Sequence, residues 1–144
     1  METTPGAAEF DPLHDYPLGS RRPDLVRTPS GLPLSALTLA GLRDGAFDAA
    51  ELRATPATIR RQAAVARAAG REPLAANLER AAELSAVDSE TVLEIYTALR
   101  PHRSTAEQLE AWAVRLEGEL GAPVNATFVR EAAAHYARRG LLRR

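Results

Sequence analysis

The sequence predicts an all-α fold, a compact bundle of about five to six short helices preceded by an extended, proline-rich N-terminal arm. Apolar residues recur at spacings of three and four between helix start and stop signals. No stretch alternates apolar and polar residues long enough for a sheet, and the only strand candidate is the few residues around Pro123-Val124. Prolines recur through the first part of the chain, at Pro5, Pro12, Pro17, Pro23, Pro29 and Pro33.

The arm covers residues 1–33, and we expect the helical domain to cover residues 34–144. Each proline disfavours helix in itself and in the residue before it. The apolar residues of the arm are too sparse to build a core. We therefore expect roughly the first dozen residues to be disordered and the rest of the arm to lie along another surface.

Two helices are predicted between residues 56 and 84. Thr55 is suited to cap a helix, and Pro56 is suited to its first position. This helix should end at Gly70, and Pro73 should open the next one. The apolar faces would consist of Ile59, Ala63 and Ala66 in the first helix and of Leu74, Leu78, Ala81 and Ala82 in the second.

Three further helices are predicted in the C-terminal part. Asp88 would begin a short helix that ends near Pro101, and a capping box of Ser104 and Glu107 would begin the next. Asn125 would cap the last helix. The three inward faces would be Val92, Ile95, Tyr96 and Leu99; then Leu109, Trp112, Ala113, Leu116 and Leu120; then Phe128, Val129, Ala132, Ala133 and Tyr136.

The charge balance excludes a strongly basic or acidic protein. Lys and Arg number 18 against 19 Asp and Glu, so the net charge is −1 and gives no field that would gather nucleic acid or anionic lipid. Every basic residue is Arg, which suits fixed carboxylate pairs at a partner surface but also follows from codon bias. The absence of cysteine rules out disulfides and thiolate chemistry and fits a reducing compartment.

No self-sufficient active site is apparent. His14, His102 and His135 are far apart in sequence and lack metal-ligand spacing. Glu131 and His135 are one helical turn apart and could form an acid/base pair, although a surface contact explains them better. Nucleophile motifs and phosphate-binding glycine loops are missing, so we predict no catalytic, cofactor or metal residue in this chain.

Two weaker alternatives come from charged residues. The carboxylate pairs Glu79-Glu83 and Glu90-Glu94 should face solvent or an arginine-bearing partner. A helix-turn-helix reading of Arg60, Arg61 and Arg67 is disfavoured by the net charge and by the acidic helix that follows.

The order of several segments resembles one family, the small (gamma) subunit of adenosylcobalamin-dependent diol and glycerol dehydratases. The resemblance covers about residues 15–142. The segments that carry it are Ala69-Gly70-Arg71, Leu74-Ala75, Arg80-Ala81-Ala82-Glu83-Leu84, Leu93-Glu94-Ile95-Tyr96, Ala98-Leu99-Arg100-Pro101, Arg103-Ser104-Thr105 and Phe128-Val129-Arg130-Glu131. His102 and Leu78 depart from the Tyr and Phe that the family tends to place there.

The resemblance implies a noncatalytic small subunit, a lyase component in an enzyme that converts a 1,2-diol or glycerol to an aldehyde and water by a radical mechanism. Adenosylcobalamin would be held by the large and medium partner subunits, and the complex would be a dimer of heterotrimers. This chain would pack on the large subunit, with Tyr16, Tyr96, Arg100, Arg103 and Trp112 as candidate interface residues.

A free-standing helical adaptor is the alternative from another class.

Neither a secretory signal nor a transmembrane run is apparent, so a cytoplasmic location is expected. The short leader before Asp15 is broken by proline, whereas relatives in bacterial microcompartments often carry a longer targeting helix, and encapsulation is therefore disfavoured.

Overall fold

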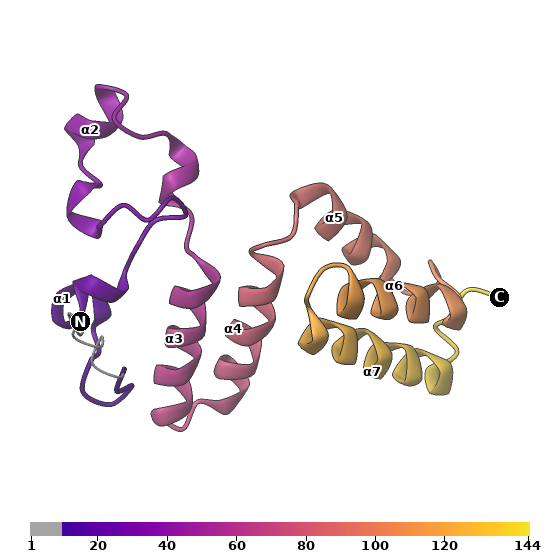
Figure 1. Ribbon diagram of the computed structural model, residues 1–144. Coiled ribbons are helices and arrows are strands. Elements are labelled where there is room, and N and C mark those ends of the chain that lie inside the picture. Colours follow the sequence, from indigo (N-terminus) through magenta and orange to yellow (C-terminus); the bar gives the residue numbers. More distant parts are fainter. Residues whose placement is uncertain (1–9) are drawn as a thin grey trace, which may run out of the picture.

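A computed structural model describes residues 10–144, and in this range the chain is helical with no extended strand. The all-α class predicted from the sequence is confirmed. Figure 1 shows short helices in the first part of the chain, then a hairpin of two longer helices, and then the C-terminal helices grouped together. The elements are α1 Leu18–Arg21, η1 Pro23–Leu25, η2 Leu34–Ala36, α2 Leu39–Arg43, η3 Ala49–Leu52, α3 Pro56–Ala68, α4 Glu72–Leu84, α5 Ser89–Ala98, α6 Ala106–Gly118 and α7 Pro123–Arg139, where η denotes a 3-10 helix.

Helices α3 and α4 form an antiparallel hairpin whose contact is built from alanine. The Thr55 side chain caps α3 by accepting from the Thr58 amide, as the sequence predicts. Gly70 turns the chain in a left-handed conformation with φ 72°. The buried residues of the contact are Ala63, Ala66, Ala75 and Ala82, whose small side chains let the two helices approach closely.

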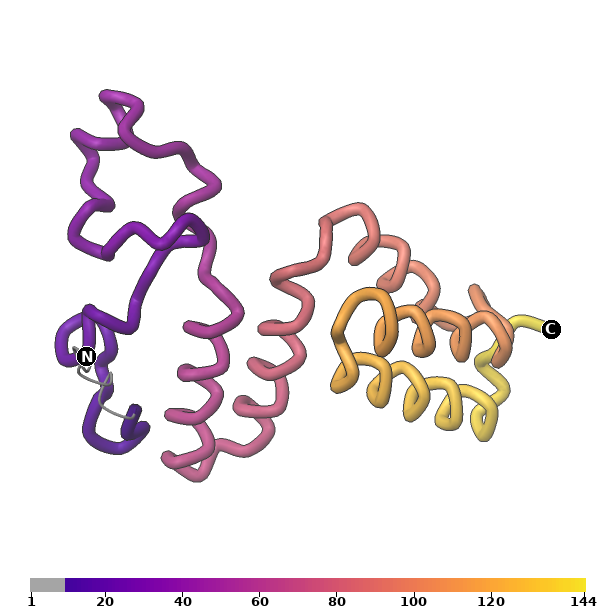
Figure 2. The backbone as a smooth tube through the Cα atoms, in the orientation of Figure 1, coloured from indigo at the N-terminus to yellow at the C-terminus, as the bar shows by residue number. Residues whose placement is uncertain are grey.

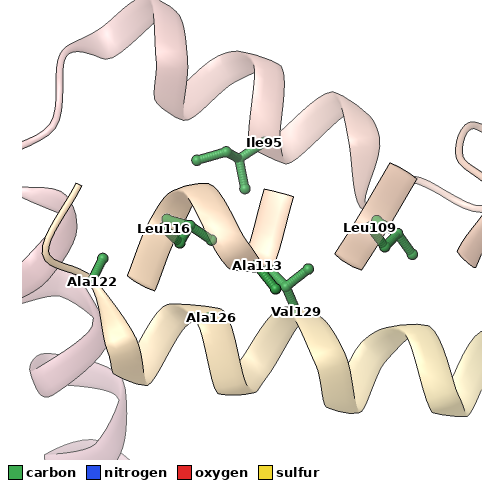
Figure 3. Close-up of a cluster of buried hydrophobic side chains, with 7 residues drawn as sticks. All are labelled: Ile95, Leu109, Ala113, Leu116, Ala122, Ala126 and Val129. Atoms are coloured by element: carbon green, nitrogen blue, oxygen red, sulfur yellow. The ribbon is translucent and has the colours of Figure 1, made fainter. Parts of the chain in front are cut away.

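The hydrophobic core lies between α5, α6 and α7. Figure 3 shows the side chains of these three helices pointing toward one another. Its largest fully buried members, Leu109, Leu116 and Val129, are at most 1% exposed. The Tyr136 hydroxyl donates to the Leu99 carbonyl at 2.6 Å and fastens α7 to the end of α5. The full cluster is Ile95, Leu109, Ala113, Leu116, Ala122, Ala126 and Val129.

Residues 10–55 contain only short helices and turns. The tube in Figure 2 traces residues 28–55 as an open lobe that extends away from α3. Within the lobe, Phe47 is buried against Gly41, where a Cβ would meet the Phe47 ring at 3.0 Å. The lobe therefore has its own small apolar contact, although many of its leucines stay exposed.

The predicted arm of residues 1–33 and the domain boundary at residue 34 remain predictions. Disorder was predicted for about the first dozen residues, and residues 1–9 lie outside the described range.

In the described part of the arm, Arg22 pairs with both Asp15 and Asp24 at 2.9 Å. Farther along, Arg61 of α3 donates to the Leu25 carbonyl at 2.9 Å. These contacts hold residues 15–25 beside α3.

Two predicted helix starts are wrong in detail. The capping box of α6 is formed by Thr105 and Gln108, while the Ser104 hydroxyl donates to the Ala98 carbonyl instead. Helix α7 begins at Pro123, two residues before the predicted cap Asn125, because proline fits the first helical position. Pro123 and Val124, the strand candidate, are therefore helical.

The inward faces of α4, α5 and α7 also differ in part from the prediction. Leu74 is 41% exposed and Tyr96 is 67% exposed, although both were assigned to inward faces. In α4 the buried positions are Ala75, Ala82 and Glu83, because the close alanine contact with α3 leaves Leu74 facing outward. In α7, Phe128 is 42% exposed while its neighbour Val129 is buried.

Candidate partner interface

Four of the five predicted interface residues lie at the corner where α5 turns into α6. Tyr96 is on the outer face of α5, Arg100 and Arg103 lie in the turn, and Trp112 lies on α6. The first three are exposed, and Trp112 is half-buried against the core cluster. Arg103 and Trp112 border the same hollow, and the interface role of all four residues remains a prediction.

The turn between α5 and α6 is held from two sides. His102 adopts a left-handed φ of 62°, and its amide donates to the Leu141 carbonyl at 2.7 Å. The Arg143 amide donates to the Ser104 carbonyl at 2.9 Å. The C-terminal residues thus brace the turn and fix the backbone that carries Arg100 and Arg103.

Trp112 borders two hollows at this corner. One, of about 510 Å³, lies between α5 and α6 and is lined by Glu90, Leu93, Glu94, Thr97, Ala98, Arg103 and Trp112. The other, of about 320 Å³, is lined by Arg103, Gln108, Arg115 and Trp112 among others. The Arg115 guanidinium stacks over the indole ring, 5.2 Å from its centroid. An aromatic residue that borders two hollows can serve as an anchor for an apposed surface.

Unpaired charges surround the exposed apolar residues of α5. Leu93 is 64% exposed and lies beside the carboxylates of Glu90 and Glu94. In the described chain, no ion pair or side-chain hydrogen bond engages Glu90, Glu94, Arg100 or Arg103. An exposed leucine beside charges that have no partner in the described chain is a combination found at protein interfaces. We call Glu90, Leu93, Glu94, Tyr96, Arg100, Arg103 and Trp112 the corner surface.

Most other arginines on the longer helices are engaged within the chain. Arg67 contacts Glu72 and Glu79 at 3.0 and 2.8 Å, and these carboxylates raise the pKa of Arg67. Arg130 of α7 contacts Glu110 and Glu117 of α6, both at 3.0 Å. Arg67 belonged to the helix-turn-helix reading, and its charge is neutralised by its own hairpin.

Tyr16, the fifth predicted residue, lies elsewhere. It is 55% exposed and borders a hollow of about 280 Å³ formed mainly by α3 and α4, with Val65, Leu74 and Leu78 among its lining residues. In Figure 1 the segment near α1 lies on one side of the α3–α4 hairpin and the α5–α6 corner on the other. The five candidates therefore form two separate regions.

The residues considered for chemistry are not assembled into a site. Among residues 10–144, no three His, Cys, Asp or Glu side chains gather in a way that could hold a metal ion. The ring Nδ1 of His135 lies 3.0 Å from Arg138 Nη2, and no hydrogen bond joins it to Glu131. His14 contacts Asp11 at 2.8 Å on the surface and lowers the pKa of that carboxyl by hydrogen bonding.

Glu83 is the position where the sequence reasoning failed most clearly. It was assigned to solvent or to a partner, but it is 7% exposed. Its carboxylate accepts hydrogen bonds from the Val124 amide, the Asn125 amide and the Asn125 side chain, at 2.9, 2.9 and 2.7 Å. One signal in the sequence was available: Ala122 precedes Pro123 and cannot cap α7, so the first amides of that helix need an acceptor from another part of the chain.

These features define a helical protein with exposed apolar side chains and unpaired charges on α5 and in the turn to α6. No helix in the described range is long and apolar enough to cross a membrane. Over residues 12–143 the sequence matches the dehydratase small subunit family. The chain belongs to this family, and it is therefore a subunit of a multi-subunit dehydratase, a carbon–oxygen lyase.

Two relatives are similar over most of their length. The chain is 45% identical over 138 residues to the propanediol dehydratase small subunit of Salmonella typhimurium, covering 96% of this chain and 80% of the relative. It is 47% identical over 129 residues to the propanediol dehydratase small subunit of Citrobacter freundii, covering 90% and 75% respectively. The family resemblance seen in the sequence is thereby confirmed.

Proposed function

We propose that this chain is the noncatalytic small subunit of an adenosylcobalamin-dependent dehydratase that converts propane-1,2-diol or glycerol to an aldehyde and water. The observation that carries the proposal is the family match over residues 12–143, supported by two relatives that share 45% and 47% identity. Large and medium subunits would complete a dimer of heterotrimers in the cytoplasm.

The corner surface is our proposed contact with the large subunit. Leu93 and Tyr96 are both more than 60% exposed, so covering them would remove apolar area from water. The unpaired Glu90, Glu94 and Arg103 would set orientation through charge pairs with the partner. Tyr16 would form a second contact at the other side of the hairpin.

The cofactor would be held by the partner subunits. The better-formed hollows on the described surface range from about 180 to 510 Å³, and none of these would enclose a corrinoid with its nucleotide tail. The three histidines His14, His102 and His135 are exposed and do not converge on a common point. The residues of this chain therefore do not fit the group.

Co-expression with dehydratase large and medium subunits tests the proposal. We expect a stable complex that forms propionaldehyde from propane-1,2-diol only when adenosylcobalamin is added, and whose yield falls when this chain is omitted. The adaptor alternative predicts a chain that stays monomeric and leaves the yield of the other two subunits unchanged. Aldehyde formation by the purified chain alone would also contradict the proposal.

A further inference from the structure

The two helical groups of the chain meet along a narrow seam between α4 and α7. Figures 1 and 2 show the α3–α4 hairpin beside the three C-terminal helices, with α4 adjacent to the beginning of α7. Contacts between α4 and α7 are far sparser than those within either antiparallel helix pair. The orientation of the two groups therefore depends on few interactions.

Polar contacts dominate the centre of this seam. Glu83 of α4 accepts three hydrogen bonds from the first turn of α7, through both of its carboxylate oxygens. The Asn125 side chain also donates to the Arg80 carbonyl at 3.0 Å, one turn earlier in α4. Both Glu83 and Asn125 are buried, with 7% and 6% exposure. Four hydrogen bonds thus join two helices that are about 40 residues apart in sequence.

Glu83 provides the cap that α7 lacks. The residue before Pro123 is Ala122, and no side chain at the N-cap position accepts a hydrogen bond. The amides of Val124 and Asn125 belong to the group that has no acceptor within the helix. A carboxylate at this end also interacts favourably with the positive end of the helix dipole. The Glu83 carboxylate therefore accepts the hydrogen bonds of the first α7 amides and at the same time fixes the position of α7 against α4.

The remaining seam contacts would not fix this orientation by themselves. The Arg80 guanidinium lies over the Phe128 ring, 5.0 Å from the centroid, but Phe128 is 42% exposed. Leu84 packs against the core cluster with a partly buried side chain. Both contacts tolerate sliding, whereas hydrogen bonds to two successive amides require one geometry.

We propose that Glu83 is a positioning residue that locks the α3–α4 hairpin to the α5–α7 group. The lock holds the Tyr16 region and the corner surface at a fixed separation, so that a partner meets one rigid surface. The lock between the two helical groups is a property of this chain alone. The role of the lock in presenting one rigid surface to a partner rests on the proposed function.

A distance measurement in the full chain tests the lock. Because the sequence has no cysteine, Gln62→Cys in α3 and Ala134→Cys in α7 introduce two exposed label sites, one in each group. Glu83→Gln keeps the side-chain shape but turns one acceptor into a donor that faces amide donors. Glu79→Gln, one turn earlier and paired with Arg67 inside the hairpin, is the matched control.

We expect one narrow label-to-label distance distribution in the parent chain and in Glu79→Gln, and a broadened or shifted distribution in Glu83→Gln. Unchanged helicity by circular dichroism would show that both groups are still folded. The same narrow distribution in Glu83→Gln would overturn the proposal.

Hydrogen exchange provides a second readout that separates local release from unfolding. The Val124 and Asn125 amides should exchange roughly tenfold faster or more in Glu83→Gln, while amides within α3 and α6 keep their protection. If Glu83→Gln lowers helicity, Asn125→Ala is measured in its place. This variant keeps the hydrogen bonds that the backbone amides of residues 124 and 125 donate to Glu83, so it should loosen the seam less. Uniform loss of protection across all helices would contradict a local lock.

Assembly with the large and medium subunits distinguishes this inference from the proposed function. Failure of the parent chain to associate would refute the proposed function, while the distance distributions would still decide the role of Glu83. If the parent chain associates and Glu83→Gln associates equally well with an unchanged distribution, the lock is refuted and the proposed function stands.

Discussion

Leu116 and Leu93 carry the same side chain but occupy opposite environments. Leu116 is fully buried in the core cluster, whereas Leu93 is 64% exposed on α5. We expect Leu116→Ala to lower the free energy of unfolding by about 2–5 kcal/mol, because it leaves a cavity among packed helices. Leu93→Ala should change it by less than about 0.5 kcal/mol. Urea denaturation of both variants checks this, and equal losses would mean that the exposed face of α5 is part of the folded core.

Asp88 is a residue whose ionisation should affect stability in acid. Its carboxylate caps α5 by accepting from the Thr91 amide at 2.8 Å, and this bond lowers the pKa of Asp88 below its ordinary value of 3.8. A group with a lowered folded-state pKa stabilises the protein above the unfolded pKa, and this contribution is lost as the pH falls through the folded pKa.

We therefore expect Asp88→Asn, which can still cap, to lose less stability than the parent chain between about pH 4 and pH 2. Other carboxyl groups with lowered pKa, such as Asp24 and Glu51, are present in both proteins and cancel in the comparison. Thermal unfolding across this range measures the difference. Parallel curves for the two proteins would contradict the capping role of the charged form.

At the scale of the element, the start of α6 has two adjacent residues that could cap the helix, Ser104 and Thr105, and only Thr105 does so. Thr105 accepts from the Gln108 amide and the Gln108 side chain accepts from the Thr105 amide, at 3.3 and 3.0 Å. Thr105→Ala should therefore cost about 1 kcal/mol of folding free energy. The control Thr127→Ala removes an exposed hydroxyl within α7 and should cost less. If Thr105→Ala costs no more than the control, the box contributes nothing to stability.

Most of the longer helices were predictable because a local signal marks at least one of their ends. Thr55 with Pro56, Asp88 and Gly70 act within a few residues of the helix end they define, so the sequence indicates them directly. The cap of α7 was missed because its acceptor, Glu83, comes from another helix. In residues 18–52, the spacing of Asp48 and Glu51 indicates the start of η3, and Asp48 does cap it. The other short helices gave no such signal, because turns of three to five residues leave no apolar periodicity to detect.

Assignment of the helix faces was less successful for a similar reason. Periodicity identifies a set of apolar residues but not which part of the set meets a neighbour. In α4, Ala75 and Ala82 are buried whereas Leu74 and Ala81 are exposed, because the hairpin requires close backbone approach on one side of the helix. The grouping of Tyr96, Arg100, Arg103 and Trp112 in one corner could be expected from their nearness in sequence, but the separation of Tyr16 from them depends on the tertiary fold.

At the scale of the whole molecule, large apolar side chains remain exposed on most of the described surface. They lie on the lobe of residues 28–55 as well as on the helices, and include Leu39, Leu52, Leu93, Tyr96 and Val114 at 55% exposure or more. The core itself relies on alanine at Ala113, Ala122 and Ala126. A chain that leaves many large apolar side chains exposed gains stability when a partner covers them.

This contrast leads to a prediction about where the partner binds. The double variant Leu93→Ala with Tyr96→Ala should weaken association with the large subunit by about 2 kcal/mol or more, roughly 30-fold, because it removes two apolar anchors from the corner surface. The control Leu39→Ala removes the most exposed leucine of the lobe, at 82% exposure, and should have a smaller effect. Sedimentation of the co-expressed subunits at several concentrations gives the affinities. If Leu39→Ala weakens association more than the double variant does, the large subunit binds chiefly to the lobe, and the corner surface is not the principal interface.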